Sequence, residues 1–189
     1  MSETTQSTAL GALIEKIRGY VKDARAGLPQ EVFLFISGLT PMVNVDLLVK
    51  DEAGRTLLTW RADSFYGPGW HVPGGVIRFK EYASTRVKEV ARAELGATVE
   101  VDQHPLLVRE VMATTRDVRG HFISLIYGCR LLSPPNPANE SLNGTPAHGQ
   151  WKWHAGCPDN LIRQHEMYRG LIDGSAIPSS AAHHWRSPA

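Results

Sequence analysis

The segment WHVPGGVIRFKEYASTRVKEVARAELGATVE, residues 70–100, constrains the fold more than any other part of the sequence. A glycine pair at positions 74–75 follows a short apolar run, and a helical pattern follows the pair. Its apolar positions lie on one helix face: Val87, Ala91 and Leu95. Ser84 is a candidate N-cap and Gly96 a stop signal. The segment therefore predicts a glycine turn that leads into an amphipathic helix over residues 84–95.

Composition narrows the class of protein. A chain of 189 residues fits one domain with extensions. The 20 Lys and Arg residues almost balance the 19 Asp and Glu residues, without a basic run of the kind that a nucleic-acid binder needs. The two cysteines, Cys129 and Cys157, suggest no disulfide framework, which favours a reduced, cytoplasmic setting. The sequence predicts neither a signal peptide nor a membrane span, and we expect no membrane partner.

The remaining segments suggest the domain organisation. Residues 8–26 carry apolar residues at helical spacing, and the runs 31–39 and 42–51 are rich in β-formers. Within residues 42–51, Asp46 alternates with apolar positions and is expected to face away from them. We therefore expect an N-terminal helical extension over residues 1–30, a main domain over 31–173, and a loosely held tail over 174–189 that includes His183 and His184.

The second half continues the mixed pattern. Residues 105–114 and 121–132 are predicted as strands, 150–154 as a short strand, and 158–172 as a last helix. The segment 133–149 is rich in Ser, Pro, Asn and Gly, which is typical of a functional flap or of disorder. Strands with a helix between them and a helix after them indicate an α/β or α+β fold, a mixed sheet sandwiched between helices.

The segment at residues 70–100 resembles the Nudix box, G-x5-E-x7-R-E-U-x-E-E-x-G-U, in which U is aliphatic. Five positions match without an insertion: Gly75, Glu81, Glu94, Gly96 and Ala97. Glu89 stands in the place of the box arginine, and Val90 and Ala93 replace two box glutamates. The resemblance implies the Nudix fold. In an ideal helix Glu89 lies about 140° around the axis from Glu94 and cannot replace the missing carboxylates.

The same two glutamates are missing in one Nudix subfamily, the GDP-mannose mannosyl hydrolases, which this chain resembles from about residue 39 to 172. That resemblance implies Mg²⁺-dependent cleavage of the sugar carbon–oxygen bond of a nucleotide sugar, which releases GDP and a free hexose. Water then attacks carbon rather than phosphorus. The metal only stabilises the departing diphosphate, so fewer carboxylates suffice. The resemblance also makes a homodimer the expected assembly.

The resemblance carries site residues onto this chain one by one. The Gly74 carbonyl and the Glu94 carboxylate match the Mg²⁺ ligands, and Asp46 and Arg61 match positions that contact the nucleotide or the leaving group. His148, five residues before Trp153, matches the catalytic base on a mobile loop. A guanidinium suits a diphosphate, and an imidazole can accept a proton from water at neutral pH.

Several positions depart from the subfamily. Val76 replaces an arginine after the glycine pair, and Arg78, two residues on, is a candidate substitute as a phosphate ligand. Ala147 replaces a metal ligand before the base, and with Glu89 in the arginine place, Glu81 needs a new partner, either Arg86 or Arg92.

Other readings of these residues stay open. Tyr66 and Trp70 are candidates to stack on a base, although large aromatic residues are more often core. Two other functions are open: a Nudix diphosphatase in which Glu89 or a loop residue completes the metal site, and a non-catalytic domain that binds a nucleotide sugar.

Overall fold

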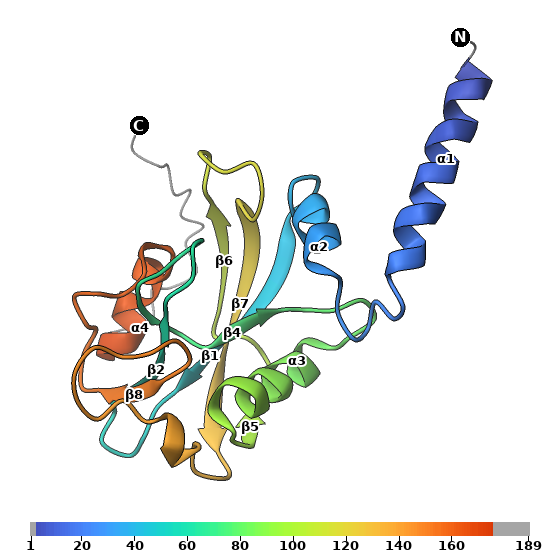
Figure 1. The fold of residues 1–189 in the computed structure, drawn as a ribbon. Coiled ribbons are helices and arrows are strands. Elements are labelled where there is room, and N and C mark those ends of the chain that lie inside the picture. Colours follow the sequence, from blue (N-terminus) through green and yellow to red (C-terminus); the bar gives the residue numbers. More distant parts are fainter. Residues whose placement is uncertain (1–2, 176–189) are drawn as a thin grey trace.

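A computed structural model describes residues 3–175 of the chain (Figure 1). The helices are α1 Glu3–Tyr20, α2 Gln30–Ser37, α3 Ala83–Val90 and α4 Arg169–Asp173. A π-helical turn, Ala91–Leu95, continues α3, and 3-10 turns lie at Pro137–Asn139 and Arg163–Tyr168. The strands are β1 Met42–Val49, β2 Thr56–Arg61, β3 Gly69–His71, β4 Gly74–Val76, β5 Val99–Val101, β6 Leu107–Met112, β7 His121–Leu131 and β8 Trp151–His154.

Two sheets form the centre of the domain. The larger runs in the order β4-β1-β7-β5, with β6 also paired to β7, and the smaller runs β3-β2-β8. β1 and β7 pair in parallel over eight positions, while β4, β5 and β6 join them antiparallel. The predicted mixed α/β architecture is confirmed, with helices on both sides of a mixed sheet (Figure 1).

Strand β1 is buried on both faces and separates two apolar cores. Val45, Leu47 and Val49 pack on one side against the buried face of α3 and its π-turn, which includes Val87, Ala91 and Leu95. Leu48 faces the other core, with Trp60, Trp70 and the C-terminal residues Leu171 and Ile172. Asp46 points to this second side, as the alternation predicts, and is only 3% exposed.

The prediction of a β-rich run at residues 31–39 is wrong, because residues 30–37 form α2. Phe33 and Ser37 both contact Arg119 of the domain, and their spacing of four residues is helical. Pro29 occupies the N-cap position, where its missing N–H costs nothing. The β-preference of Val, Ile and Phe is worth only a few tenths of a kcal/mol per residue, and packing overrides it.

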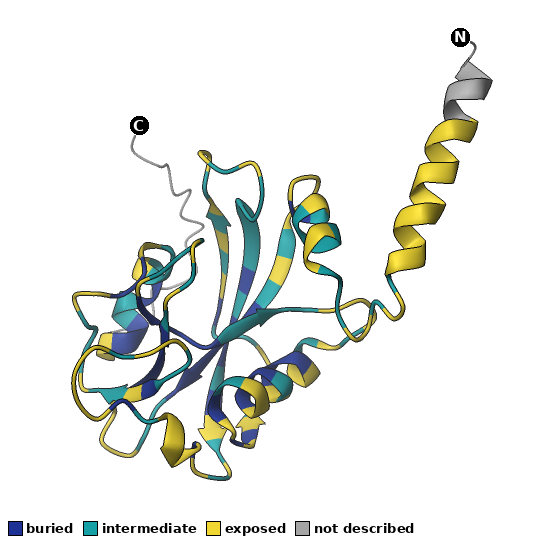
Figure 2. Cartoon of the chain, in the orientation of Figure 1, coloured by how far each residue is buried: buried dark blue, intermediate teal, exposed yellow. Residues whose placement is uncertain are grey.

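Helix α1 projects from the domain, and its described side chains are exposed (Figures 1 and 2). It ends at Tyr20 rather than continuing to residue 26 as predicted. Asp23 accounts for the difference, because its carboxylate accepts the backbone N–H of Arg25 at 2.9 Å. Such an Asx turn competes with helical hydrogen bonding.

Two other helix predictions need correction. Ser84 is not an N-cap: Tyr82 holds that position, without a side-chain cap. The C-terminal stretch predicted as one helix is a 3-10 turn followed by the short α4. Gly96 does end the central helix, in the left-handed conformation (φ 63°) that glycine adopts without strain.

The Ser- and Pro-rich segment 133–149 packs against the domain, since Asn136 donates to the Leu95 carbonyl and accepts from the Trp151 indole. Residues 176–189, with His183 and His184 of the predicted tail, lie outside the described residues. Within residues 3–175, no helix has the length and apolar character needed to cross a bilayer.

Candidate active site

The glycine pair and Glu94 meet at the edge of the larger sheet. Gly74 lies opposite Asp46 in the antiparallel ladder of β1 and β4. The Leu47 N–H donates to the Pro73 carbonyl and the Ile77 N–H donates to the Val43 carbonyl, so Gly74 and Asp46 form a non-hydrogen-bonded pair. The N–H and C=O of Gly74 therefore both point away from β1. The Gly74 N–H reaches the Glu94 carboxylate. Its carbonyl therefore lies on the same side as Glu94.

The Glu94 carboxylate sits in a poorly solvated position without a strong cationic partner. It accepts the Thr59 hydroxyl at 3.3 Å, and His71 Nε2 lies 3.9 Å away. Burial raises its pKa to about 7, against the opposing effects of Arg61, the Gly74 N–H and Thr59. A cation close to this carboxyl group would favour its ionised form. The side chain keeps 31% of its exposure, so an ion from solvent can reach it.

These residues fit a magnesium ion that shares its ligands with a substrate. Within residues 3–175, no three His, Cys, Asp or Glu side chains converge as a metal-binding group. An ion here would use Glu94 and the Gly74 carbonyl, with phosphate and water oxygens as its other ligands. Mg²⁺ commonly binds through one or two carboxylates plus substrate phosphates.

The replaced box positions do not contribute carboxylates. Val90 is buried in the core and packs closely on Gly75, where an added β-carbon would lie 2.9 Å from Val90 Cγ2. Ala93 is exposed. Glu89 pairs with Arg92 at 2.8 Å on the exposed side of the helix. The π-turn invalidates the ideal-helix angle, but Glu89 is still directed to solvent rather than to Glu94.

Glu81 has found its partner in Arg86. Both Glu81 oxygens accept from the Arg86 guanidinium at 2.8 Å, and the two side chains are only 12% and 9% exposed. This bidentate pair ties the loop after β4 to α3. Of the two partners that the sequence suggested, Arg92 is occupied by Glu89.

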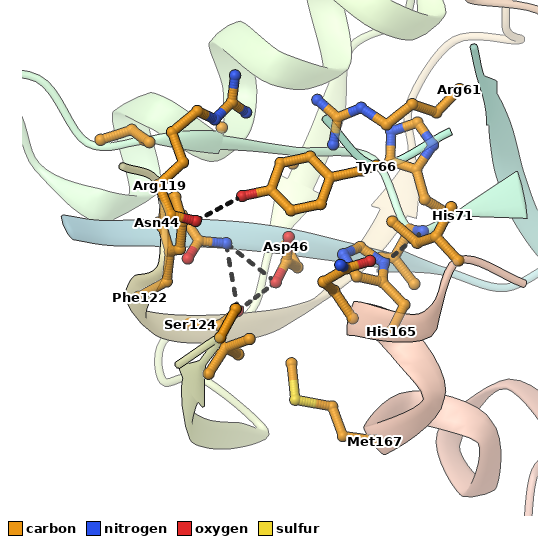
Figure 3. Close-up of a pocket in the computed structure, with 18 of the residues that line it drawn as sticks. Asn44, Asp46, Arg61, Tyr66, His71, Arg119, Phe122, Ser124, His165 and Met167 are labelled. Atoms are coloured by element: carbon orange, nitrogen blue, oxygen red, sulfur yellow. Dashed lines mark hydrogen bonds between the residues drawn. The ribbon is translucent and has the colours of Figure 1, made fainter. Parts of the chain in front are cut away.

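Asp46 is the centre of a buried hydrogen-bond network at the bottom of a pocket (Figure 3). Its Oδ2 accepts from the Ser124 hydroxyl, from Tyr168 Oη at 2.6 Å and from Asn44 Nδ2 at 3.1 Å. Burial raises its pKa to about 6, although the hydrogen bonds and Arg61 favour the charged form. The network fixes this carboxyl group beside the glycine pair.

Arg61 lies at the end of β2 and lines the same pocket as Asp46 and Gly74. Its Nε is 2.5 Å from an Asp63 oxygen, and its guanidinium carbon is 5.2 Å from the centre of the Tyr66 ring. Its positive charge also opposes the rise in pKa that burial causes in both Asp46 and Glu94. The structure therefore brings together three predicted residues, Asp46, Arg61 and Glu94, with Gly74 between them.

His148 reaches the site from the loop before β8. Its Nδ1 accepts the backbone N–H of Ala62 at 3.1 Å, directly after Arg61. A neutral imidazole that accepts at Nδ1 carries its proton on Nε2 and is a donor there. In this conformation His148 is next to the site but cannot take a proton from water until it releases Ala62.

Arg78 and Trp70 lie away from the site. Arg78 is exposed, and its Nη1 points to the Arg25 carbonyl at 3.4 Å, beside the linker before α2. Trp70 is 5% exposed and packs edge-on against Trp60 in the core. Val76 lines the pocket where the resembling subfamily has an arginine. Tyr66, which also lines it, is the aromatic residue that can contact a ligand.

Comparison with known proteins finds a relative in sequence. The chain is 32% identical to the low-salt glycan biosynthesis protein Agl8 of Haloferax volcanii over 150 residues, 77% of this chain and 91% of Agl8. No family model matches the sequence.

The fold also matches solved structures. One is a protein from Jonesia denitrificans that is described as a possible asymmetric diadenosine tetraphosphate hydrolase (TM-score 0.55, 18% identity, covering 75% of this chain and 99% of that one). A second is a MutT protein from Methanosarcina mazei (TM-score 0.54, 17% identity, covering 71% of this chain and 95% of that one). A third is a MutT Nudix hydrolase from Burkholderia pseudomallei (TM-score 0.53, 19% identity, covering 72% of this chain and 98% of that one). The chain has the Nudix fold and belongs to one family with Agl8.

The Nudix glycine pair has a steric reason in this chain. A β-carbon on Gly74 would overlap a carboxylate oxygen of Asp46 and lie 2.9 Å from the Val45 carbonyl oxygen. We expect Gly74→Ala to lower the free energy of unfolding by about 1–3 kcal/mol. Urea unfolding measures this loss. Gly11→Ala is the matched control, because nothing lies within 4 Å of its new methyl group. Equal stability of Gly74→Ala and wild type would contradict the assigned packing.

The environment of His165 predicts that the folded protein loses stability in acid. Its Nδ1 accepts the Val72 N–H at 3.0 Å, and His71, Arg61 and Tyr168 surround it. Burial, with Arg61, lowers its pKa to about 3. Because the folded pKa lies below the unfolded value near 6.5, the stability from neutral His165 is present above pH 6.5 and is lost as pH falls toward 3.

His165→Gln should therefore flatten the fall in stability below pH 6.5, since glutamine keeps an acceptor and does not titrate. Thermal midpoints between pH 7 and pH 4 measure the slope. His104→Gln, at an exposed position, should keep the wild-type slope. Parallel curves for His165→Gln and wild type would show that this ring does not control acid stability.

Several residues around Asp46 and in its pocket were not predicted from the sequence. Ser124 lies beside Asp46 because β7 pairs in parallel with β1, opposite Asn44. Tyr168 and His165 arrive from the C-terminal 3-10 turn, and Arg119 from the turn between β6 and β7. Alternation along β7 places Ser124 on a buried face of the strand, and this alternation is the sequence feature that could have indicated Ser124.

Proposed function

We propose that this Nudix protein is a Mg²⁺-dependent hydrolase of a nucleotide sugar, which breaks the sugar carbon–oxygen bond and releases GDP and a free hexose. The carrying observation is that the central helix presents a single carboxylate to the glycine turn. Glu94 is there, while Val90 is core, Ala93 is a methyl group at the surface and Glu89 is paired outward. One carboxylate suits the support of a leaving diphosphate better than the activation of water at phosphorus.

The chain's residues have separate tasks in this proposal. Mg²⁺, when bound, would neutralise the departing diphosphate. Glu94 and the Gly74 carbonyl hold the ion, Arg61 donates to phosphate oxygens, and Asp46, fixed by Ser124 and Tyr168, accepts from hydroxyl or N–H groups of the ligand. Water attacks the sugar carbon and gives its proton to His148 after that ring leaves Ala62, and the bond electrons leave with GDP.

The relative supports a sugar-containing substrate. Agl8 is named as a glycan biosynthesis protein, and activated sugars are the usual donors in the assembly of glycans. Product analysis tests the reaction. GDP-mannose, Mg²⁺ and the protein should yield GDP and mannose, and reaction in ¹⁸O-water should place the label in the sugar. GMP with mannose 1-phosphate would instead establish the diphosphatase alternative.

A non-catalytic binding domain is the second candidate, and the state of His148 is the observation that favours it. The one ring nitrogen that could accept a proton is already bonded to Ala62, and the preceding residue is Ala147, whose N–H donates to Gln150. Tight binding of GDP-mannose without Mg²⁺, together with no product after long incubation, would support this function over both enzymes.

We further propose that α1 mediates a homodimer. Leu10, Leu13, Ile14 and Ile17 are 38–59% exposed on a helix that contacts solvent on all its described sides, and they follow a heptad-like spacing. Replacing Leu13 and Ile17 with Asp should shift the mass in light scattering from twice 20.9 kDa to 20.9 kDa. Arg18→Gln, off this face, is the control and should stay dimeric. A wild-type monomer at high concentration would exclude the dimer.

A further inference from the structure

Three arginines surround one pocket tyrosine. The guanidinium carbons of Arg61, Arg116 and Arg119 lie 5.2, 4.4 and 5.0 Å from the centre of the Tyr66 ring. Arg61 comes from β2, and the other two from the turn between β6 and β7. Tyr66 lies between Arg61 and Arg119 in Figure 3, on the side of the pocket across from Ser124. Guanidinium groups gathered around one ring create a positive potential that favours a bound anion.

The local contacts do not neutralise this cluster. Arg61 has Asp63 as a partner, but within residues 3–175 neither Arg116 nor Arg119 forms an ion pair with a carboxylate. Arg116 Nη2 donates to the Phe65 carbonyl, while its Nη1 and the Nε of Arg119 are buried without a hydrogen-bond partner. Buried, unpaired guanidinium N–H groups are costly, and a bound ligand is a common reason for them.

The backbone and the aromatic residues hold Arg119 in this position. Its φ of 53° is left-handed, a conformation that costs energy in a residue other than glycine. Its N–H donates to Ser37 of α2 at 3.0 Å, and its carbonyl accepts from the Tyr66 hydroxyl at 2.9 Å. Its guanidinium also lies 4.7 Å from the Phe65 ring centre. The side chain is thus preorganised at the pocket rather than free in solvent.

We propose that Arg119 and Tyr66, which line the pocket, form together with the neighbouring Arg116 an anion subsite for a third negative group of the ligand, beyond the diphosphate. Arg61 lies on the His71 side of Tyr66 in Figure 3, and His71 is 3.9 Å from Glu94, whereas Arg119 lies across the tyrosine from Arg61. The third group is a carboxylate or a phosphate. The identification of the ligand as an anionic nucleotide sugar rests on the proposed function, whereas the anion subsite does not.

Polyphosphates test the subsite without any assumption about base, sugar or reaction. In metal-free buffer, calorimetry should show that wild type binds tripolyphosphate about tenfold more tightly than pyrophosphate. Arg119→Gln and Arg116→Gln should each remove most of this preference. Arg130→Gln is the control, because Arg130 is exposed and pairs with Glu100 on another part of the sheet. The same preference in all four proteins would overturn the subsite.

Two ligand pairs then identify the source of the third anion. GDP-mannuronate differs from GDP-mannose by a carboxylate on the sugar, and GTP differs from GDP by a phosphate on the nucleotide. An Arg119-dependent gain of about tenfold within the first pair places the anion on the sugar, and within the second pair on the nucleotide. No Arg119-dependent gain in either pair would overturn the ligand class. Product release is measured separately, so a failure of GDP-mannose hydrolysis refutes the proposed function and leaves the polyphosphate result standing.

Discussion

Glu94→Gln should lower kcat/KM for the nucleotide sugar by about 10²- to 10³-fold and weaken the dependence of rate on Mg²⁺. Glutamine keeps the size of the side chain and removes the one ionisable oxygen ligand at the glycine turn. The Thr59 hydroxyl and the Gly74 N–H can still contact the amide oxygen, so the local structure should survive. Steady-state rates across a Mg²⁺ titration measure both effects.

The same substitution should not destabilise the metal-free protein above pH 7. Burial raises the pKa of Glu94 to about 7, above its unfolded value near 4.5, so its contribution to stability is present at low pH and is lost as pH rises through 7. The neutral amide avoids that loss. Glu89→Gln, on the exposed side of the helix, is the matched control and should keep wild-type rates. Full Mg²⁺-dependent activity in Glu94→Gln would place the metal elsewhere.

His148→Ala should lower kcat by about 10²- to 10⁴-fold, the usual contribution of a general base, with little change in KM. The structure explains why kcat and not binding should respond. His148 contacts the Ala62 backbone rather than the pocket, and must change its partner to accept a proton. Rates at saturating and at low substrate concentration separate the two constants.

The control for His148 is His104→Ala, at an exposed position in the loop before β6. It should leave both constants unchanged. A rise in KM alone for His148→Ala would make His148 a binding residue. Wild-type constants in that variant would remove it from the site and would favour a different base or the non-catalytic function.

Much of the fold and of the candidate site was predictable from local sequence. The alternation along residues 42–49 placed Asp46 on the opposite face from Val45 and Leu47, because successive strand residues point to opposite sides. This result depends on residues a few positions apart. The joint role of Gly74 and Glu94, which are 20 positions apart, was predicted instead from the family resemblance, because the matching motif fixes the spacing of both residues.

Packing decided the segments in which local preference is weak. Residues 30–37 have β-forming side chains and still form α2, because helical spacing lets Phe33 and Ser37 both contact Arg119. Glu81 pairs with Arg86 rather than Arg92 because α3 begins where it does.

The sequence by itself determined the strand–glycine turn–helix unit and the loss of two box carboxylates, because both are properties of neighbouring residues. Only the tertiary structure decided that Arg61, Tyr66, Arg116 and Arg119 form one cluster. It also placed His148 at Ala62, 86 positions away along the chain. Contacts between distant segments depend on how sheets pair and turns pack, and no local periodicity encodes them.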